Sequence, residues 1–362
     1  MALAKITLQN FRNHAASELA ETAHFNLLVG ENGAGKTNVL EAISLLSPGR
    51  GLRRAALTDL ARRGSLDTAP GAFAIGANLI EQGQISARIG TYTQTSRPAR
   101  RQVRINGAEA SAGSLAQWHA VSWLTPAMDG LFTDSAAARR RFVDRMALAI
   151  EPDHARAVSQ LEKALRERNR LLEERGEARW LDAIEAQAAQ HGSEVARTRA
   201  QTIALLAEEL STLPPEPFAR PVLTYRAGGP FAASELRAAL ARHRPRDRAA
   251  GRALTGPHRD ELEVVMASSR QPAASCSTGE QKAMLIAITL AYGALASSGR
   301  PSVLLLDEVA AHLDPLRRSE LFRRLRSGAA QVWMTGTELA PFADIASEAA
   351  IWRVSGGTLE RA

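Results

Sequence analysis

A phosphate-binding pattern at residues 30–37 constrains the fold of this chain more than any other segment. The pattern is G-x-x-x-x-G-K-T, and it stands between an apolar run, residues 25–29, and a helix-like stretch, residues 38–46. Its glycines let successive backbone N–H groups curl around phosphate oxygens, and the helix that follows directs the positive end of its dipole at the anion. We therefore predict a strand, a phosphate loop and a helix, with the loop formed by Gly30, Glu31, Asn32, Gly33, Ala34, Gly35, Lys36 and Thr37.

The last two residues of this loop indicate a nucleoside triphosphate with Mg²⁺. Lys36 is placed to reach the β- and γ-phosphates, and Thr37 is placed to set its hydroxyl on Mg²⁺. A glycine turn that happens to precede Lys-Thr is the alternative, which the strand before it and the helix after it disfavour. ATP and Mg²⁺ are thus the expected ligands.

Two adjacent carboxylates in the last third of the chain supply the second half of such a site. Asp307 and Glu308 follow an apolar run, residues 303–306, of the kind found in buried parallel strands. Asp307 would hold Mg²⁺ through a water, and Glu308 would orient or deprotonate the attacking water. Many parallel strands end in an acid, so the pair is informative only beside the phosphate loop. Together they predict an ATPase site with Glu308 and Lys36 as catalytic residues.

Residues 277–282, Ser-Thr-Gly-Glu-Gln-Lys, resemble the signature motif of ABC-type ATPases. Alone, Ser-x-Gly at the start of a helix is more often an ordinary N-cap, but the order of loop, signature and Asp-Glu strand is specific. In that superfamily the signature faces the γ-phosphate of a nucleotide held by the other subunit. The resemblance therefore implies an ATP-dependent homodimer in which Ser277, Thr278, Gly279 and Glu280 act in trans.

Two later segments resemble further parts of the same superfamily. Residues 311–314 look like the D-loop, which includes Asp314. Thr335 and Thr337 stand at the switch position, where many relatives have histidine. The resemblance implies that these residues lie near the γ-phosphate, and which of them replaces the histidine stays open.

Composition limits the class of protein. The chain has 362 residues, 45% of them hydrophobic, and a net charge of +7, which suits a globular protein of two or three lobes. The basic charge favours nucleic acid or an anionic membrane as partner without deciding between them. The single cysteine, Cys276, excludes an intramolecular disulfide and fits a reducing compartment. The longest apolar stretch has about 14 residues, too few to span a bilayer, so we expect a cytoplasmic protein with no membrane partner.

Periodicity divides the chain into α/β ends and a helical middle. Alternation over residues 3–11 and 72–106, the latter broken by turn signals, predicts an antiparallel β-subsheet. Ser135 is an expected N-cap, and two long apolar stripes after it predict a helical hairpin. The other expected elements are helices at 154–175, 180–212, 233–243, 283–295 and 316–326, strands at 121–126, 222–225, 262–265, 303–306 and 332–334, and a flexible basic stretch at 244–252.

These elements predict an α/β fold that resembles the ABC/SMC-type P-loop ATPase head, with a parallel sheet, an antiparallel β-subsheet and an inserted, mainly helical second lobe. We place the N-terminal part of the ATPase lobe at residues 1–130 and the helical insert at 131–254. Residues 255–362 return to the ATPase lobe with the signature, the catalytic strand and the D-loop. The helices of the insert would be about 30 to 50 Å long, which makes a compact lobe and not a long coiled-coil arm.

Several blocks narrow the resemblance to the RecF family of DNA replication and repair proteins. They are residues 8–14 (LQNFRNH), 30–40 (GENGAGKTNVL), 139–144 (RRRFVD) and 255–260 (TGPHRD), and they occur in the order of the family. The resemblance implies that Arg12 and Asn13 lie at the nucleotide and that ATP hydrolysis is weak and stimulated by DNA. It also implies action at gaps and stalled forks, helping RecA to load with RecO and RecR as partners.

Arginine clusters are the candidates for contact with double-stranded DNA. Two of them are Arg50, Arg53 and Arg54 after the loop helix, and Arg100, Arg101 and Arg104 in the β-subsheet, and a further group is Arg242, Arg244, Arg246 and Arg248. Each cluster alone is more often a solvated surface, and the family resemblance shifts the first two towards the duplex backbone. Few aromatic residues accompany them, so we expect salt-dependent phosphate recognition with little base specificity. Arg139 to Arg141 could instead be structural ion-pairing groups.

The resulting hypothesis is an ATP-gated dimer that clamps gapped or junction-containing duplex DNA and releases it after slow hydrolysis. One alternative is the ATPase subunit of a transporter, which the 241-residue separation of Lys36 and Ser277 disfavours. The other is a nucleotide-dependent scaffold that does not hydrolyse ATP, which the presence of Glu308 disfavours.

Overall fold

The computed structural model describes residues 3–62, 71–81, 84–214, 216–296 and 300–362. The chain divides into two compact units, the first within residues 1–129 and 288–362 and the second within residues 130–287. In the described ranges, no helix combines the length and the apolar character needed to cross a membrane.

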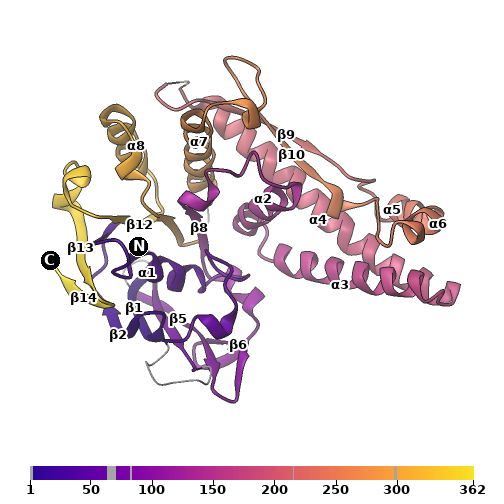
Figure 1. The fold of residues 1–362 in the computed structure, drawn as a ribbon, viewed down its shortest axis with the longest axis horizontal. Helices are drawn as coiled ribbons and strands as arrows, with labels where there is room; N and C mark the ends of the chain where they lie inside the picture. Colours follow the sequence, from indigo (N-terminus) through magenta and orange to yellow (C-terminus); the bar gives the residue numbers. More distant parts are fainter. Residues whose placement is uncertain (1–2, 63–70, 82–83, 215, 297–299) are drawn as a thin grey trace. The chain divides into compact units, whose positions relative to one another are not determined.

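The first unit contains a six-stranded sheet with five parallel strands. Its strands are β3 (Phe25–Val29), β8 (Ala120–Leu124), β11 (Ser302–Leu306), β12 (Gln331–Gly336), β13 (Ala349–Ser355) and β14 (Thr358–Arg361) (Figure 1). The order across the sheet is β14-β13-β3-β12-β11-β8, and β14 alone is antiparallel to its neighbour. Every residue of β3, β8, β11 and β12 is buried, because unbroken apolar runs suit strands that are covered on both faces.

A second, antiparallel sheet completes this unit. Its strands are β1 (Leu3–Phe11), β2 (His14–Leu19), β4 (Ala74–Glu81), β5 (Gln84–Gln94), β6 (Arg97–Ile105) and β7 (Ala108–Ala110), in the order β2-β1-β4-β5-β6-β7 (Figure 1). Burial alternates along β4, with Ile75, Ala77 and Leu79 on the inner face. The predicted antiparallel β-subsheet over residues 72–106 is confirmed, and β2 and β7 are additional strands.

The main core of the first unit joins the inner face of the antiparallel sheet to helix α1 (Lys36–Ser44) and the parallel strands. Ile75 of β4, Ile43 of α1 and Trp333 of β12 belong to one buried cluster. Trp333 also stacks on Trp352 of β13, with ring centroids 5.5 Å apart. A further helix of this unit, α8 (Pro315–Ser327), buries one face through Leu321, Phe322 and Leu325.

The second unit is mainly helical. Its elements are α2 (Ala136–Ile150), α3 (His154–Glu173), α4 (Ala178–Thr212), β9 (Pro221–Arg226), α5 (Ala233–Arg242), α6 (Arg244–Ala249), β10 (Glu261–Met266) and the first part of α7 (Thr278–Ala296) (Figure 1). Ser135 caps α2 as predicted, because its Oγ accepts a hydrogen bond from the Ala138 N–H at 3.4 Å. The apolar stripes of α3 and α4 pack together through residues such as Leu161 and Val195.

Two segments differ from the sequence predictions. Residues 255–287 belong to the second unit, not to the ATPase lobe, because β10 pairs with β9 in an antiparallel ribbon. The stretch at 244–252 is not a flexible linker, since it contains α6, whose Asp247 is fully buried. Both differences arise from contacts between residues that are distant in the sequence.

Candidate active site

The phosphate loop connects β3 to α1 and is shaped by close backbone packing. Gly33 and Gly35 have φ angles of +83° and +118°, which glycine adopts without strain. Gly30 donates its N–H to the Gly336 carbonyl at 3.2 Å, and a Cβ at this position would lie 2.1 Å from the Val354 oxygen. The loop therefore keeps its shape only with glycine at position 30.

The turn between β1 and β2 forms one wall of the loop. Asn13 donates to the Ala34 carbonyl at 2.9 Å and accepts from the Asn38 side chain at 2.7 Å. His14 is buried and lies 3.2 Å from the Gly35 carbonyl through its Nε2. Burial lowers the pKa of His14, so the ring is neutral near pH 7. Asn13 thus lies at the loop, where the family resemblance places it.

Lys36 is held inside the loop that it belongs to. Its Nζ donates to the carbonyl oxygens of Gly30 at 2.7 Å and Glu31 at 2.9 Å, and the residue is 4% exposed. Burial lowers the pKa of Lys36, and the negative charges of Glu308 and Asp307 oppose this shift. The ammonium therefore lies within electrostatic reach of Glu308, the predicted catalytic carboxylate, and of Asp307, the predicted Mg²⁺ ligand.

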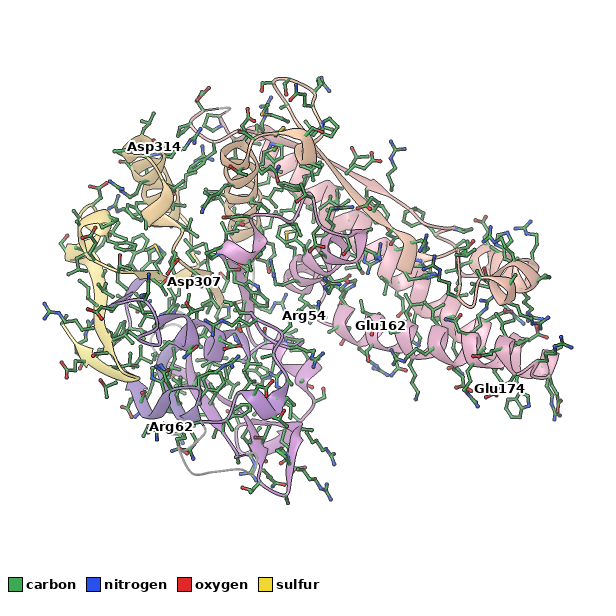
Figure 2. All side chains as sticks on the ribbon, in the orientation of Figure 1. Arg54, Arg62, Glu162, Glu174, Asp307 and Asp314 are labelled. Carbon is green, nitrogen blue, oxygen red and sulfur yellow. The ribbon has the colours of Figure 1, made fainter. Side chains whose placement is uncertain are left out.

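Asp307, labelled in Figure 2, directly follows β11. One of its carboxylate oxygens accepts hydrogen bonds from two threonine hydroxyls. Thr37 donates to Oδ1 at 2.9 Å, and Thr335 of β12 donates to the same atom at 2.8 Å. Burial raises the pKa of Asp307, while the hydrogen bonds from Thr335 and Thr37 oppose the shift. The Thr37 hydroxyl and the Asp307 carboxylate thus bring two oxygen ligands close together, which suits Mg²⁺.

Glu308 follows in a backbone conformation that Thr335 fixes. Its φ angle is +55°, unusual for a residue with a side chain, and its N–H donates to Thr335 Oγ1 at 2.9 Å. The buried Thr335 hydroxyl thus donates to Asp307 and accepts from the Glu308 N–H. We therefore assign Thr335 to the support of these two residues. Thr337, the other residue at the switch position, is exposed.

A buried carboxylate on α1 that the sequence analysis did not single out binds two of the candidate arginines. Glu41, whose side chain is 2% exposed, accepts two hydrogen bonds at 2.9 Å from Arg12. Arg53 reaches the same carboxylate at 3.3 Å and donates to Asn38 Oδ1 at 2.7 Å. The charge of Arg53 is also among the groups that oppose the burial-driven rise in the Asp307 pKa. Arg53, predicted to contact DNA, is therefore tied to the nucleotide site.

The signature residues belong to the second unit, at the start of α7. Ser277 and Glu280 form a capping box, in which Glu280 Oε2 accepts from the Ser277 N–H at 2.8 Å and Ser277 Oγ accepts from the Glu280 N–H at 3.3 Å. Ser277, Thr278 and Gly279 are exposed. The N-cap geometry is thus present, and the exposed surface leaves these residues accessible to another molecule.

The D-loop residue Asp314 is the N-cap of α8 in the first unit (Figure 2). It accepts a hydrogen bond from the Arg317 N–H at 3.0 Å. Leu316, two residues later, is 70% exposed. Asp314 therefore shapes an exposed corner, not the interior of the site.

The arginines of β6 lie on opposite faces of the strand, because successive side chains alternate along it. Arg100 and Arg104 are exposed, and Arg104 lies over the Tyr92 ring at 5.3 Å. Arg101 points inward and donates to Thr91 Oγ1 at 2.7 Å and to the Gly49 carbonyl at 2.7 Å. Arg101 is therefore unsuited to the DNA contact predicted for it, because its guanidinium is used inside the unit. Arg50 and Arg54 are exposed.

Two of the sequence blocks meet in a buried ion network in the second unit. Arg199 of α4 contacts Asp144 at 2.7 Å and Asp260 at 3.0 Å, which come from blocks 139–144 and 255–260. Arg139 pairs with Glu261 at 2.6 Å, so this arginine is the structural ion-pairing group considered above. These ion pairs connect parts of the second unit that are distant in the sequence.

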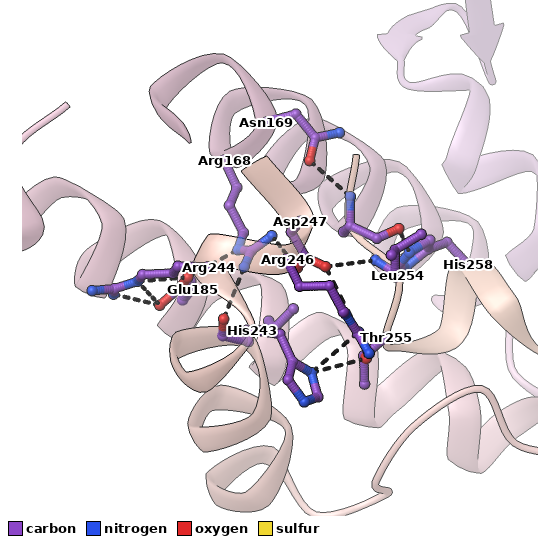
Figure 3. A network of polar contacts seen from close by, with 12 residues as sticks. Arg168, Asn169, Glu185, His243, Arg244, Arg246, Asp247, Leu254, Thr255 and His258 are labelled. Carbon is purple, nitrogen blue, oxygen red and sulfur yellow. Dashed lines mark hydrogen bonds and ion pairs between the residues drawn. The ribbon is translucent and has the colours of Figure 1, made fainter. Parts of the chain in front are cut away.

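The predicted basic group within residues 242–248 is also largely structural (Figure 3). Arg168 is fully buried and contacts Glu185 and Asp247, both at 2.9 Å. Arg244 binds the same Glu185 at 2.5 Å, and Arg248 donates to the Leu172 carbonyl at 2.9 Å. Most of the charge at 244–248 is therefore used to pack α6 against α3 and α4.

Comparison with known sequences identifies close relatives along the whole chain. The model of the RecF/RecN/SMC N-terminal domain matches residues 2–354. The DNA replication and repair protein RecF of Brucella suis is 46% identical over 372 residues, covering 99% of this chain and 96% of that protein. RecF of Mesorhizobium japonicum is 46% identical over 374 residues, with 99% and 97% coverage.

Comparison with solved structures confirms the predicted fold class. The recombination mediator protein RecF with ATP, of the RecFOR pathway, matches with a TM-score of 0.86 and 21% identity, covering 100% of this chain and 97% of that one. An Smc head bound to the C-terminal winged-helix domain of ScpA matches with a TM-score of 0.57 and 15% identity, covering 100% and 98%. At these identities the likeness concerns the fold, which is that of an SMC-type ATPase head.

Proposed function

Because this chain belongs to the RecF family of DNA replication and repair proteins, we propose that it is an ATP-gated protein that binds double-stranded DNA during recombinational repair. ATP would join two copies of the chain, the dimer would hold duplex DNA near gaps, and slow hydrolysis would release it. The similarity to a RecF of the RecFOR pathway supports RecR and RecO as partners in loading RecA.

One observation carries the ATPase part of this proposal: Thr37 and Thr335 both donate to Asp307 Oδ1 beside the phosphate loop. Thr37 and Asp307 would hold Mg²⁺, which when bound neutralises charge on the phosphoryl oxygens. Lys36 can turn from the Gly30 and Glu31 carbonyls to the β- and γ-phosphates. Glu308, fixed at its backbone by Thr335, would orient the attacking water and accept its proton.

The dimer is supported by the separation of the site residues between two units. The phosphate loop and Asp307 belong to the first unit, whereas the exposed signature residues at the start of α7 belong to the second. A helix N-terminus with accessible N–H groups is suited to anionic oxygens. We propose that Ser277, Thr278 and Gly279 face the nucleotide of the second copy, with Asp314 at the same interface.

Variants that affect different steps test the dimer. Lys36→Met should abolish ATP binding and ATP-dependent dimers, while Ser277→Arg should bind ATP but stay monomeric. Glu308→Gln should dimerise and persist as a dimer, because hydrolysis is blocked. Sedimentation with and without ATP gives the association state, and Ser211→Arg, at an exposed serine on α4, is the matched control. Normal dimers in Ser277→Arg would refute the two-copy site.

The DNA contact is proposed for the exposed arginines of the first unit. Arg100 and Arg104 lie on the outer face of β6, and Arg50 is exposed after α1. Removing two phosphate contacts by Arg100→Met with Arg104→Met should lower the salt dependence, d log K/d log[salt], by about 2. Gln102→Met, between them on the same strand, is the control. An unchanged slope would remove this face from the DNA site.

The same measurements separate the alternatives. A scaffold that does not hydrolyse ATP would show no phosphate release in a single turnover, even with DNA. A transporter subunit would show no ATP-dependent binding of duplex DNA. Gapped duplex, plain duplex and single strand, each with and without ATP, would give the DNA preference.

A further inference from the structure

Arg101 is a half-buried cation whose hydrogen bonds, among the described residues, go to uncharged oxygens. Its Nε donates to Thr91 Oγ1 at 2.7 Å, and its Nη1 donates to the Gly49 carbonyl at 2.7 Å. Its Nη2 donates to the Ser47 carbonyl at 3.1 Å and to the Leu45 carbonyl. One side chain from β6 therefore holds three carbonyl groups at the end of α1 and in the loop that follows.

Removing this guanidinium from water costs free energy. Fixing one conformation of the loop is a structural reason for keeping it. Burial lowers the pKa of Arg101 to about 10, and in the described part of the chain its hydrogen bonds go to one hydroxyl and three backbone carbonyl groups. The carbonyl groups at the C-terminal end of α1 carry the negative end of the helix dipole, which partly compensates the charge. A buried charge that an apolar side chain could replace is a candidate for specifying one geometry.

The loop that Arg101 holds is compact and returns along α1. Gly49 and Gly51 have φ angles of +94° and +70°, and a Cβ at Gly51 would lie 2.9 Å from the Leu45 side chain. The Leu52 N–H donates to Ser44 Oγ at 2.8 Å. The loop then delivers Arg53 to Glu41 and Asn38.

From Arg53 a continuous set of contacts leads to the phosphate loop. Glu41 binds Arg12, and Asn38 binds Asn13, which donates to the Ala34 carbonyl. Arg53 also acts electrostatically on Asp307. The position of the loop after α1 is thus linked both to the phosphate loop and to the catalytic carboxylates.

We propose that Arg101 is a positioning residue for ATP hydrolysis, which holds the loop after α1 so that Arg53 stays on Glu41 and Asn38 beside the catalytic site. This inference rests on the proposed ATPase function. Without Arg101, three carbonyl groups lose their donor and the loop can move. The phosphate loop itself keeps its supports from β12, β13 and Asn13, so ATP affinity should persist while turnover falls.

The experiment compares Arg101→Met, which keeps the length of the side chain, with Arg101→Lys. In Arg101→Met we expect kcat to fall at least about tenfold, because small displacements of active-site groups have large effects on rate. The Kd for a fluorescent ATP analogue should change less than about threefold. Lysine offers three donors without the planar fork, so Arg101→Lys should recover part of the rate. Gln102→Met, the next residue but on the outer face, is the control.

Hydrogen exchange of residues 47–54 in the same variants provides the readout of loop position. Faster exchange there in Arg101→Met, with unchanged exchange in the phosphate loop, supports positioning. A kcat within twofold of the wild type, or a loss of kcat that merely follows the folded fraction, would overturn it. If the wild type itself fails to hydrolyse ATP, the proposed function fails, and unchanged exchange at 47–54 would separately overturn the role of Arg101.

Discussion

Thr335→Val tests whether one buried hydroxyl supports both catalytic carboxylates. Thr335 is fully buried, and valine has the same shape without the hydroxyl. The substitution removes the hydrogen bond to the charged Asp307, worth about 1.5 to 3 kcal/mol, and leaves the Glu308 N–H without its acceptor, which costs about 1 kcal/mol more. The expected loss in the free energy of unfolding is therefore about 3 kcal/mol.

Thr335→Ser is the matched variant, because it keeps the hydroxyl and removes one buried methyl group. It should cost about 1 kcal/mol, so the two variants should differ by about 2 kcal/mol in urea unfolding followed by tryptophan fluorescence. Hydrolysis should also separate them. In Thr335→Val the Asp307 carboxyl loses a group that lowers its pKa, and the Glu308 backbone loses its anchor, so kcat should fall about tenfold or more. Equal stability and equal kcat in the two variants would refute the reasoning.

Three further outcomes follow from buried groups elsewhere. Arg199→Met should cost about 3 to 5 kcal/mol, measured by urea unfolding, because it removes the buried guanidinium that pairs with both Asp144 and Asp260. Burial lowers the pKa of His119 from 6.5 to about 4, so the unfolded chain binds more protons between these values. Stability should therefore fall by about 3 kcal/mol as the pH drops from 6.5 to 4, and His119→Leu should lack this dependence. Gly30→Ala should weaken ATP binding at least about tenfold, since its Cβ would overlap the Val354 oxygen. Gly293→Ala in α7 is the control and should be neutral or stabilising, because there is free space for a Cβ at this helical position.

The sequence was most informative where chemistry depends on consecutive residues. The phosphate loop, Asp307 and Glu308 were predictable because a short motif after a buried strand determines their local geometry. The structure places Lys36, Thr37 and Asp307 together as this pattern indicates. Their trans partners at 277–280 remain a proposal, since they concern a second copy of the chain.

The roles of individual arginines could not be assigned from clustering. Arg100 and Arg101 are neighbours in the sequence and lie on opposite faces of β6, so treating them as one cluster was misleading. Alternation with the apolar Val103 could have indicated that Arg101 points inward. Glu41 offered no such signal, because its link to Arg12 and Arg53 depends on the tertiary fold.

The boundary predicted between residues 254 and 255 differs from the end of the second unit, residue 287, for a similar reason. The block at 255–260 comes just before β10. Nothing local shows that β10 pairs with β9, because 34 residues of helix and loop lie between the paired residues Arg226 and Glu261. Pairing between distant segments is decided by burial over the whole unit, which a reading of local periodicity does not contain.

The packing of β3 has a consequence for the synthesis of the protein. Its described neighbours in the sheet are β12 and β13, and the shape of the loop depends on Val354 behind Gly30 and on the Gly357 N–H, which donates to the Ala34 carbonyl at 3.0 Å. The 326 residues between Gly30 and Gly357 take roughly 15 to 65 s to translate. A nascent chain therefore carries the full nucleotide-binding motif long before β12, β13 and Gly357 are available to support it. Nucleotide binding, and any dimer that depends on it, is thereby delayed until the segment up to Gly357 has been made.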